Sequence, residues 1–339
     1  MVAAVASCSK MERVPDKTMH EIVLSAFGGT MTKSNALSTD VQFGVYAFYS
    51  ACDGGTDWND PNAWGALTSS STYIDNGAFA HRNGFWGGDP TPYYWPVDGS
   101  LMFAGYAPMM TVDSDENPTG PVRSVELVAN QLDMNPYLHI NFTQNTNPAQ
   151  MVDFLWFDVK DVAGGKTISK TDQSISIEFK HALAQVSFEF LDAANHFQLK
   201  SIKLKDCINT SEFYSGATPG WLPAIDAVAD YVFLNVAEDA EKPQFNGWET
   251  PDDEMLYIIP QYLDGIFPSV NGTLDNGLDV VLEFTLTDGF GSEVVQIPLK
   301  NYTERWEMGK HYHYTVSVMA DPIEFTTPDF TITTQVVSM

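Results

Sequence analysis

The sequence predicts an all-β protein with two tandem β-sandwich domains. Apolar residues recur with a period of about two, which is typical of half-buried strands, whereas long helical patterns are scarce. The alternating segments are short, and spacers rich in Gly, Asn, Asp and Pro separate them. The chain has 339 residues, of which 44% are hydrophobic, so it can fill the cores of two domains.

The alternating segments follow one another along the chain. Residues 41–49 carry apolar side chains at both parities, so we expect a strand that is covered on both faces, as in a sandwich core. Residues 138–142 alternate on one face. Residues 278–299 alternate on both sides of an Asp-Gly-Phe-Gly turn and predict a hairpin, and residues 312–318 predict a further strand.

Residues 175–190 change their parity. Apolar residues have odd numbers up to Phe179 and even numbers from Val186 onward. Either a β-bulge or a strand that moves from one sheet to another produces such a one-residue change, and both alternatives stay open. We expect His181, which lies at the change, to be structural.

A Gly-rich segment supplies the best domain boundary. It runs from Gly164 to residue 173 and divides the chain into an N-terminal sandwich, residues 21–172, and a C-terminal sandwich, residues 173–339. Residues 1–20 then form a truncated lipoprotein signal and a polar tether.

The first residues predict where the protein is located in the cell. Val5-Ala6-Ser7-Cys8 resembles a bacterial lipobox, in which small residues precede a lipid-bearing cysteine. The basic region and most of the apolar region of a full signal are missing, so the start is truncated or the match is due to chance. We expect lipid at Cys8, export, and attachment to the outer membrane at the cell surface. No stretch reaches the roughly 18 consecutive apolar residues of a spanning helix.

Charge and cysteines limit the partners. There are 17 Lys and Arg against 44 Asp and Glu, a net charge of -27, so this surface repels nucleic acid and anionic membranes. With three cysteines, at least one is unpaired or modified. Cys52 and Cys207 either pair with each other or are two buried free thiols.

Candidate chemical sites are weak. His311 and His313 share a strand face, but no further ligand follows at metal spacing, so we expect an ordinary solvated face. Acidic loops at residues 53–60 and 113–117 lack the closing Glu of a calcium loop and predict turns. No nucleophile elbow, zinc-protease motif or phosphate loop occurs. We therefore expect no enzyme, cofactor or metal.

An aromatic-rich segment has two interpretations. Trp58, Trp86 and Trp95 lie in a loop-rich region with Asp and Asn between the rings. Such residues form sugar- or peptide-binding loops, or they form a small core packed on the sandwich.

Several stretches together resemble the fimbrillin (Mfa-like) family of Bacteroidales. None is specific alone, but their order and spacing agree over almost the whole chain. They are residues 21–27, 32–33, 43–48, 101–108, 154–157, 177–188, 202–204, 257–261, 306–310 and 312–316.

The resemblance implies two transthyretin-like β-sandwiches and a lipoprotein precursor that is carried to the outer membrane. In stalk subunits of the family, a trypsin-like protease removes the first strand, and a donor strand from the C-terminus of another subunit fills the groove. An incomplete sandwich exposes unpaired backbone and an apolar trough, which a strand from a neighbour satisfies.

Mapped by resemblance, the displaced strand is residues 21–27, with Ile22, Leu24 and Ala26 facing inward. Lys33 is the basic residue of the following loop and the expected cleavage site. Arg13 is an alternative, but cleavage there would leave the strand attached.

The donor strand is residues 330–337, with Phe330, Ile332 and Val336 on one face and Thr334 between them. The alternative is that both segments are permanent strands. We therefore expect a structural pilus subunit that serves adhesion and whose partners are other subunits, the same or related. The alternative function is a non-polymerising tip adhesin, anchor or surface lipoprotein that recognises a host or bacterial glycan or protein through the aromatic loops.

Overall fold

The architecture is all-β, as the sequence predicts. A computed structural model gives the fold, and in its described part every regular element is a β-strand or a short 3₁₀ turn. The 3₁₀ turns are η2 (Pro148–Gln150), η5 (Asp252–Glu254) and η6 (Leu299–Asn301). The described residues are 20–28, 39–50, 72–96, 100–128, 137–157, 175–192, 197–216, 218–223, 227–269, 272–275, 277–287, 291–319 and 329–339.

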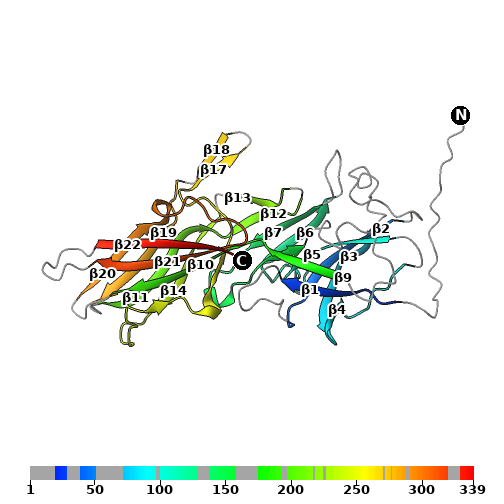
Figure 1. Ribbon diagram of the computed structural model, residues 1–339, viewed down its shortest axis with the longest axis horizontal. Coiled ribbons are helices and arrows are strands. Elements are labelled where there is room, and N and C mark those ends of the chain that lie inside the picture. The colour runs from blue at the N-terminus through cyan, green and yellow to red at the C-terminus, as the bar shows by residue number, and fades with distance from the viewer. Residues whose placement is uncertain are drawn as a thin grey trace, which may run out of the picture.

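One end of the elongated molecule holds a sheet that closes on itself (Figure 1). Its strand order is β1-β4-β3-β2-β5-β8-β9, and the barrel closes because β9 pairs with β1. The strands are β1 (Val23–Gly28), β2 (Phe43–Ser50), β3 (Thr72–Arg82), β4 (Phe85–Gly88), β5 (Ser100–Ala107), β8 (Leu155–Phe157) and β9 (Ile175–His181).

The middle of the molecule holds a four-stranded sheet in the order β13-β12-β7-β6. It joins residues from both halves of the chain, because β12 pairs with β7. Its strands are β6 (Val122–Val128), β7 (Tyr137–Thr143), β12 (Thr210–Tyr214) and β13 (Gly220–Pro223).

The other end contains two further sheets and a separate hairpin, β17–β18. One sheet has the order β15-β10-β21-β22, with β16 also paired to β10, and the other has the order β14-β11-β19-β20. The strands are β10 (Ala184–Leu191), β11 (Gln198–Ile208), β14 (Val228–Asn235), β15 (Trp248–Glu249), β16 (Leu256–Ile258), β17 (Ile266–Ser269), β18 (Gly272–Asp275), β19 (Val281–Thr287), β20 (Ser292–Pro298), β21 (Lys310–Met319) and β22 (Asp329–Ser338).

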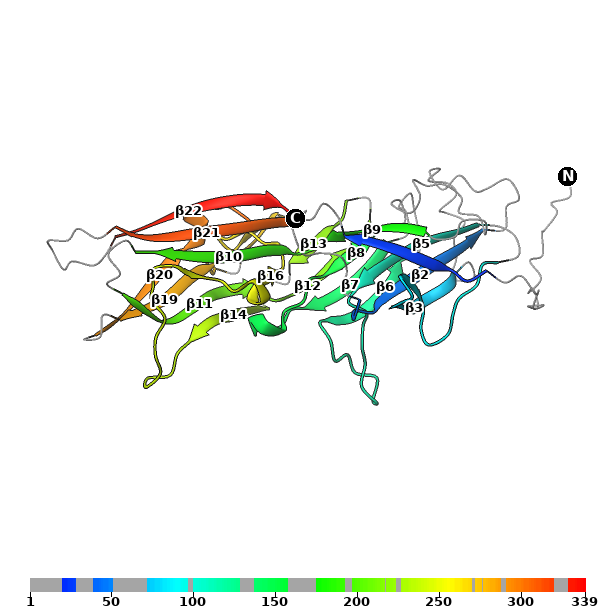
Figure 2. The ribbon, with the colours of Figure 1, turned by 60° about the horizontal axis from the view of Figure 1, so that its bottom comes forward.

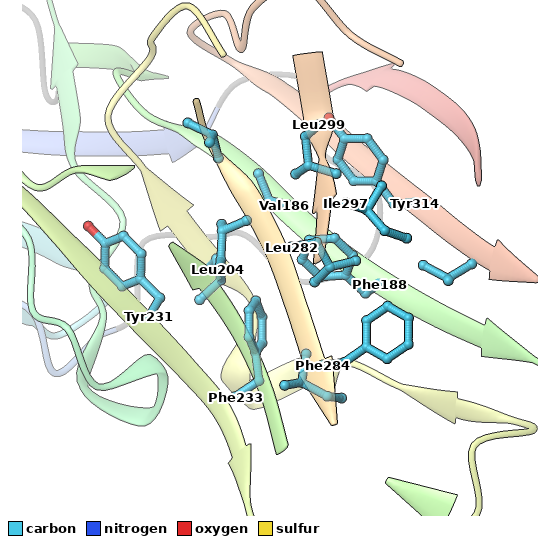
Figure 3. Close-up of a cluster of buried hydrophobic side chains, with 14 of the residues drawn as sticks. Val186, Phe188, Leu204, Tyr231, Phe233, Leu282, Phe284, Ile297, Leu299 and Tyr314 are labelled. Atoms are coloured by element: carbon cyan, nitrogen blue, oxygen red, sulfur yellow. The ribbon is translucent and has the colours of Figure 1, made fainter. Parts of the chain in front are cut away.

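Aliphatic and aromatic side chains together fill the space between these two sheets (Figure 3). Phe188 stacks on Tyr314 with ring centroids 5.5 Å apart, and Phe190 meets Phe284 edge to face at 5.3 Å. Alternation along β10, β19 and β21 puts these rings on the inward faces, where burial of apolar area stabilises the fold.

The predicted strands are present. Residues 41–49 correspond to β2, in which six consecutive residues from Phe43 are buried, and residues 138–142 lie in β7. The predicted hairpin at 278–299 is β19–β20, which pairs from Val281↔Pro298 to Thr287↔Ser292. Residues 312–318 lie in β21.

The parity change marks a strand that moves between sheets, the second of the two alternatives. β9 pairs with β1 and β8, whereas β10 pairs with β16 and β21. The chain crosses at Ala182 and Leu183, both fully buried. His181 is buried beside the crossing and its Nδ1 lies 2.5 Å from Asp153 Oδ2, a structural contact.

The change from the sheets of the first half to those of the second half does not coincide with the predicted domain boundary. The division at 172/173 lies outside the described residues, and β9, which follows it, belongs to the closed sheet of the first half. β12 and β13 also join strands of the first half. The correction has a simple cause: the Gly-rich segment that suggested the boundary precedes a strand that still completes the first sheet.

Candidate functional site

The strand predicted to be displaced, β1, lies between two neighbours. Its first residues pair antiparallel with β4, with Val23 opposite Gly87 and Leu24 opposite Trp86. From Leu24 to Gly28 it also pairs in parallel with β9. Figure 2 shows β1 beside β9 along one side of the sheet. Loss of β1 would therefore leave the edges of both β4 and β9 unpaired.

The inward side chains of the β1 segment are part of the core. Ile22 and Leu24 are fully buried, in a cluster that includes Phe43, Trp86 and Phe179. Ala26, the third predicted inward residue, lies opposite Ile177 of β9. The period of two along this segment explains why alternate residues meet the core.

A short bridge fixes the start of the β1 segment. The N–H of Ile22 donates to the Tyr93 carbonyl at 2.8 Å, and the Trp95 N–H donates to the His20 carbonyl at 2.9 Å. Glu21 forms an ion pair with Arg82, both about a third exposed. Such a partly exposed pair contributes about 1 kcal/mol or less, so the backbone bonds and the buried side chains hold the segment.

The predicted donor strand, β22, is an edge strand. It pairs antiparallel with β21 over ten consecutive residue pairs, from Lys310↔Ser338 to Met319↔Asp329, without a register shift. Among the described strands only β21 pairs with it. Figure 2 shows it at the rim of the C-terminal end of the molecule.

β22 is weakly attached to the core. Ile332 is 8% exposed and belongs to the C-terminal core, whereas Val336, on the same face, is 52% exposed. Thr334 lies between them, and its Oγ1 is buried without a hydrogen-bond partner in the described structure. Phe330 lies in the strand, opposite Val318. Only part of the predicted inward face is therefore used inside this molecule.

The tryptophan prediction requires a correction. Trp86 is 4% exposed and lies 5.1 Å from the Phe43 ring, and Trp95 is 8% exposed and contacts Phe103 edge to face at 6.1 Å. Both indoles fill the core of the closed sheet, so they do not present a ligand-binding surface. This agrees with the second interpretation, a small core. Trp58 lies outside the described residues.

Other predicted positions also lie outside the described residues. These are Cys8, Arg13, Lys33, Cys52 and the acidic loop at 53–60. Cys207 is a free, fully buried thiol, and burial raises its pKa well above the usual value, so it stays protonated and inert.

The second acidic loop is a turn. Asp113 Oδ1 accepts hydrogen bonds from the backbone N–H groups of Asp115 and Asn117, each at 2.9 Å. These bonds, that from Asn117 foremost, lower the pKa of Asp113. Its carboxylate thus organises the loop, as expected for turn chemistry.

The two histidines of β21 form a hydrogen-bonded group with β10. Ser187 Oγ lies 2.8 Å from His311 Nε2 and 2.9 Å from His313 Nδ1. Burial, then the neighbouring His313, lower the pKa of His311 and favour its neutral form. Within the described ranges, no three His, Cys, Asp or Glu side chains are placed to hold a metal.

The sequence did not predict two features of this site, the backbone bonds of residues 93–95 and the exposure of one end of β22. Tyr93 and Trp95 bond through their backbones to residues 20–22, although no periodic pattern marks their segment. The half-exposed end of β22 also escaped prediction, because alternation shows which face a residue takes but not whether a second sheet covers it. In the described part of the chain, no helix is long and apolar enough to cross a membrane.

Comparisons with known proteins agree with this architecture. A crystal structure of a fimbrial protein from Bacteroides vulgatus superposes with a TM-score of 0.56 at 16% identity, covering 95% of this chain and 99% of that one. One of a candidate cell adhesion protein from Bacteroides ovatus gives 0.50 at 13% identity, covering 95% and 98%. These likenesses show the fold alone, and no curated protein matches the chain. The model of the fimbrillin-like family, however, matches residues 30–334, and the chain therefore belongs to that family.

Proposed function

We propose that this chain is a structural subunit of a cell-surface pilus, serves adhesion, and joins its neighbours by strand exchange. Proteolysis at Lys33 releases β1, and β22 of another subunit enters the vacated slot. The observation that most supports this proposal is the position of β1 between β4 and β9. Its departure would leave two unpaired strand edges beside an apolar trough, a combination that strand addition satisfies.

The trough suits an alternating strand. Ile22 and Leu24 fill it from one face of their segment, two residues apart. β22 offers Phe330, Ile332 and Val336 on one face at the same period. An incoming strand of this pattern would restore both the backbone pairing and the buried apolar contacts.

β22 can leave its own sheet at modest cost. Ile332 is its contribution to the C-terminal core among the described side chains, and Val336 remains half exposed. The strand is at the edge of its sheet, so among the described strands only β21 must be given up, together with the bond from the Met339 N–H to the Gly309 carbonyl. A donor must be stable enough to stay folded and weak enough to be released, and the edge position and the half-exposed Val336 of β22 support this role.

Members of a fimbrial family act at the cell surface, and a lipid at Cys8 would tether the precursor to the outer membrane. The several acyl chains of a bacterial lipoprotein would anchor the protein firmly, which a single acyl chain does not. We expect mass spectrometry of the N-terminal peptide from the native bacterium to show an acylated Cys8, and the Cys8→Ser variant to be released from membranes. An unmodified Cys8 in membrane-bound protein would refute this anchor.

Limited trypsin digestion tests strand exchange. We expect cleavage near Lys33, followed by ladders that resist SDS and by oligomers in native mass spectrometry. The Lys33→Gln variant should form no SDS-resistant ladder under the same digestion, and a chain that lacks residues 329–339 should be cleaved but should form no ladder. Arg13→Gln is the matched control and should assemble like the parent. Clean cleavage at Lys33 without multimers would count heavily against the proposal.

A further inference from the structure

The outer edge of β22 lacks the features that usually protect a sheet edge. Apart from Asp329, its first residue, β22 contains no charged residue and no proline. The strand pairs with β21 in an unbroken register, so no bulge twists its edge away. Val336 and Val337 are 52% and 51% exposed. A long, regular, uncharged edge with exposed β-branched residues readily pairs with another strand.

The middle of this strand also contains a buried polar atom without a hydrogen-bond partner among the described residues. Thr334 Oγ1 is buried and has no hydrogen-bond partner in the described structure. Its neighbours on the same face are Ile332, which is buried, and Val336, which is not. A partner strand that placed a hydroxyl beside Thr334 and an apolar side chain beside Val336 would satisfy both.

The sequence of β22 is such a partner for itself. We propose that β22 pairs with β22 of a second copy of this chain, antiparallel and with the two-fold axis at Thr334. Thr334 then lies opposite Thr334 of the second copy, and Ile332 opposite Val336. On the outer face Thr333 lies opposite Gln335. Thr–Thr and apolar pairs directly opposite one another are stabilising in sheets.

Charge favours this contact over others between copies. Each chain carries a net charge of -27, so most surfaces of two copies repel. In the proposed register no residue from 330 to 338 adds a like-charge pair. Because salt screens the general repulsion, with a Debye length of about 30 Å at 0.01 M and about 8 Å at 0.15 M, association should strengthen as salt rises. One added edge buries little area, so the dimer is concentration-dependent.

The contact concerns β22 in its own sheet and does not rest on strand exchange. A dimer formed in this way would keep β22 paired with β21 in its own sheet, and would therefore oppose the release of β22 for strand exchange. The experiment therefore uses the full chain with Lys33→Gln, in which neither strand is released. Sedimentation velocity from about 1 μM to about 1 mM covers the range of weak interfaces, and we expect a monomer–dimer equilibrium.

Variants that introduce charges on β22 test the register. Thr333 and Gln335 are exposed, so Thr333→Lys with Gln335→Lys leaves the monomer folded. It should weaken the dimer at least about tenfold, because like charges then lie opposite one another. The Thr333→Glu, Gln335→Glu variant should do the same, and a mixture of the two should form heterodimers. A chain that stays monomeric throughout, a dimer that neither variant weakens, or a mixture without heterodimers would overturn the proposal.

Cross-linking gives an independent readout. Thr334→Cys should form a disulfide-linked dimer on mild oxidation, because the two copies of residue 334 are directly opposite. Val337→Cys is the matched control and should not cross-link, since the proposed register places residue 331 of the second copy opposite it. The parent chain reports any background from Cys8, Cys52 and Cys207. Cross-linking through residue 337 but not 334 would contradict the register.

Discussion

Replacing Leu24 with alanine should lower the free energy of unfolding of the uncleaved chain by about 2–5 kcal/mol. Leu24 is fully buried between Trp86 of β4 and Ile175 of β9, and its removal leaves a cavity that rigid aromatic neighbours cannot fill. Urea unfolding followed by tryptophan fluorescence measures the loss, because Trp86 reports on the same cluster.

The same substitution should accelerate strand exchange. Leu24 stabilises β1 in the slot but is absent once β1 has left, so the variant favours release after cleavage. We expect Leu24→Ala to form ladders faster than the parent at equal protease. Ser25→Ala, on the opposite, half-buried face of β1, is the matched control and should change stability by about 0.5 kcal/mol or less. Equal unfolding curves for the two variants would show that β1 is not packed as described.

Gly105→Ala should destabilise the protein by about 1–3 kcal/mol or more. Gly105 lies where β2, β5 and β8 meet, opposite Val45 on one side and Phe157 on the other. A Cβ atom there would approach the Gly44 carbonyl to 2.6 Å and collide with the Phe157 ring. Backbone of a neighbouring strand cannot move aside cheaply, so the sheet must deform.

Gly220→Ala is the control for Gly105→Ala. Gly220 is also a strand residue, in β13, but a Cβ atom there meets nothing within 4 Å. Alanine removes backbone freedom from the unfolded chain, so this variant should be neutral or slightly stabilising. Thermal unfolding by circular dichroism should separate the two variants by several degrees. Equal melting temperatures would mean that the close approach at Gly105 is relieved without cost.

The sequence was sufficient to predict several of the strands but not the boundaries between sheets. Period-two alternation located β2, β7, β19 and β21, because each has one face or both against a core. The crossing at Ala182–Leu183 was visible as a change of parity. The assignment of β9 to the first sheet was not, because its partner β1 lies about 150 residues away and pairing over such distances leaves no local pattern.

The candidate site was predictable to a similar degree. Alternation and the family resemblance placed Ile22 and Leu24 inward, and the structure buries both. The burial of Trp86 and Trp95 was one of two open interpretations, because a sequence of aromatic and polar residues fits a binding loop as well as a core. The exposure of Val336 depends on how far the facing sheet extends, which is a tertiary property.

The crossing from β9 to β10 also determines how the molecule would carry a load. Both strands run roughly along the long axis, and each is bonded side by side to parallel neighbours, β9 to β1 and β10 to β21 (Figures 1 and 2). A pull along that axis would act on these bonds in shear, so many must break together. A pull across the axis would open them one after another. A filament built end to end from such units would therefore resist traction along its length far better than peeling from its side.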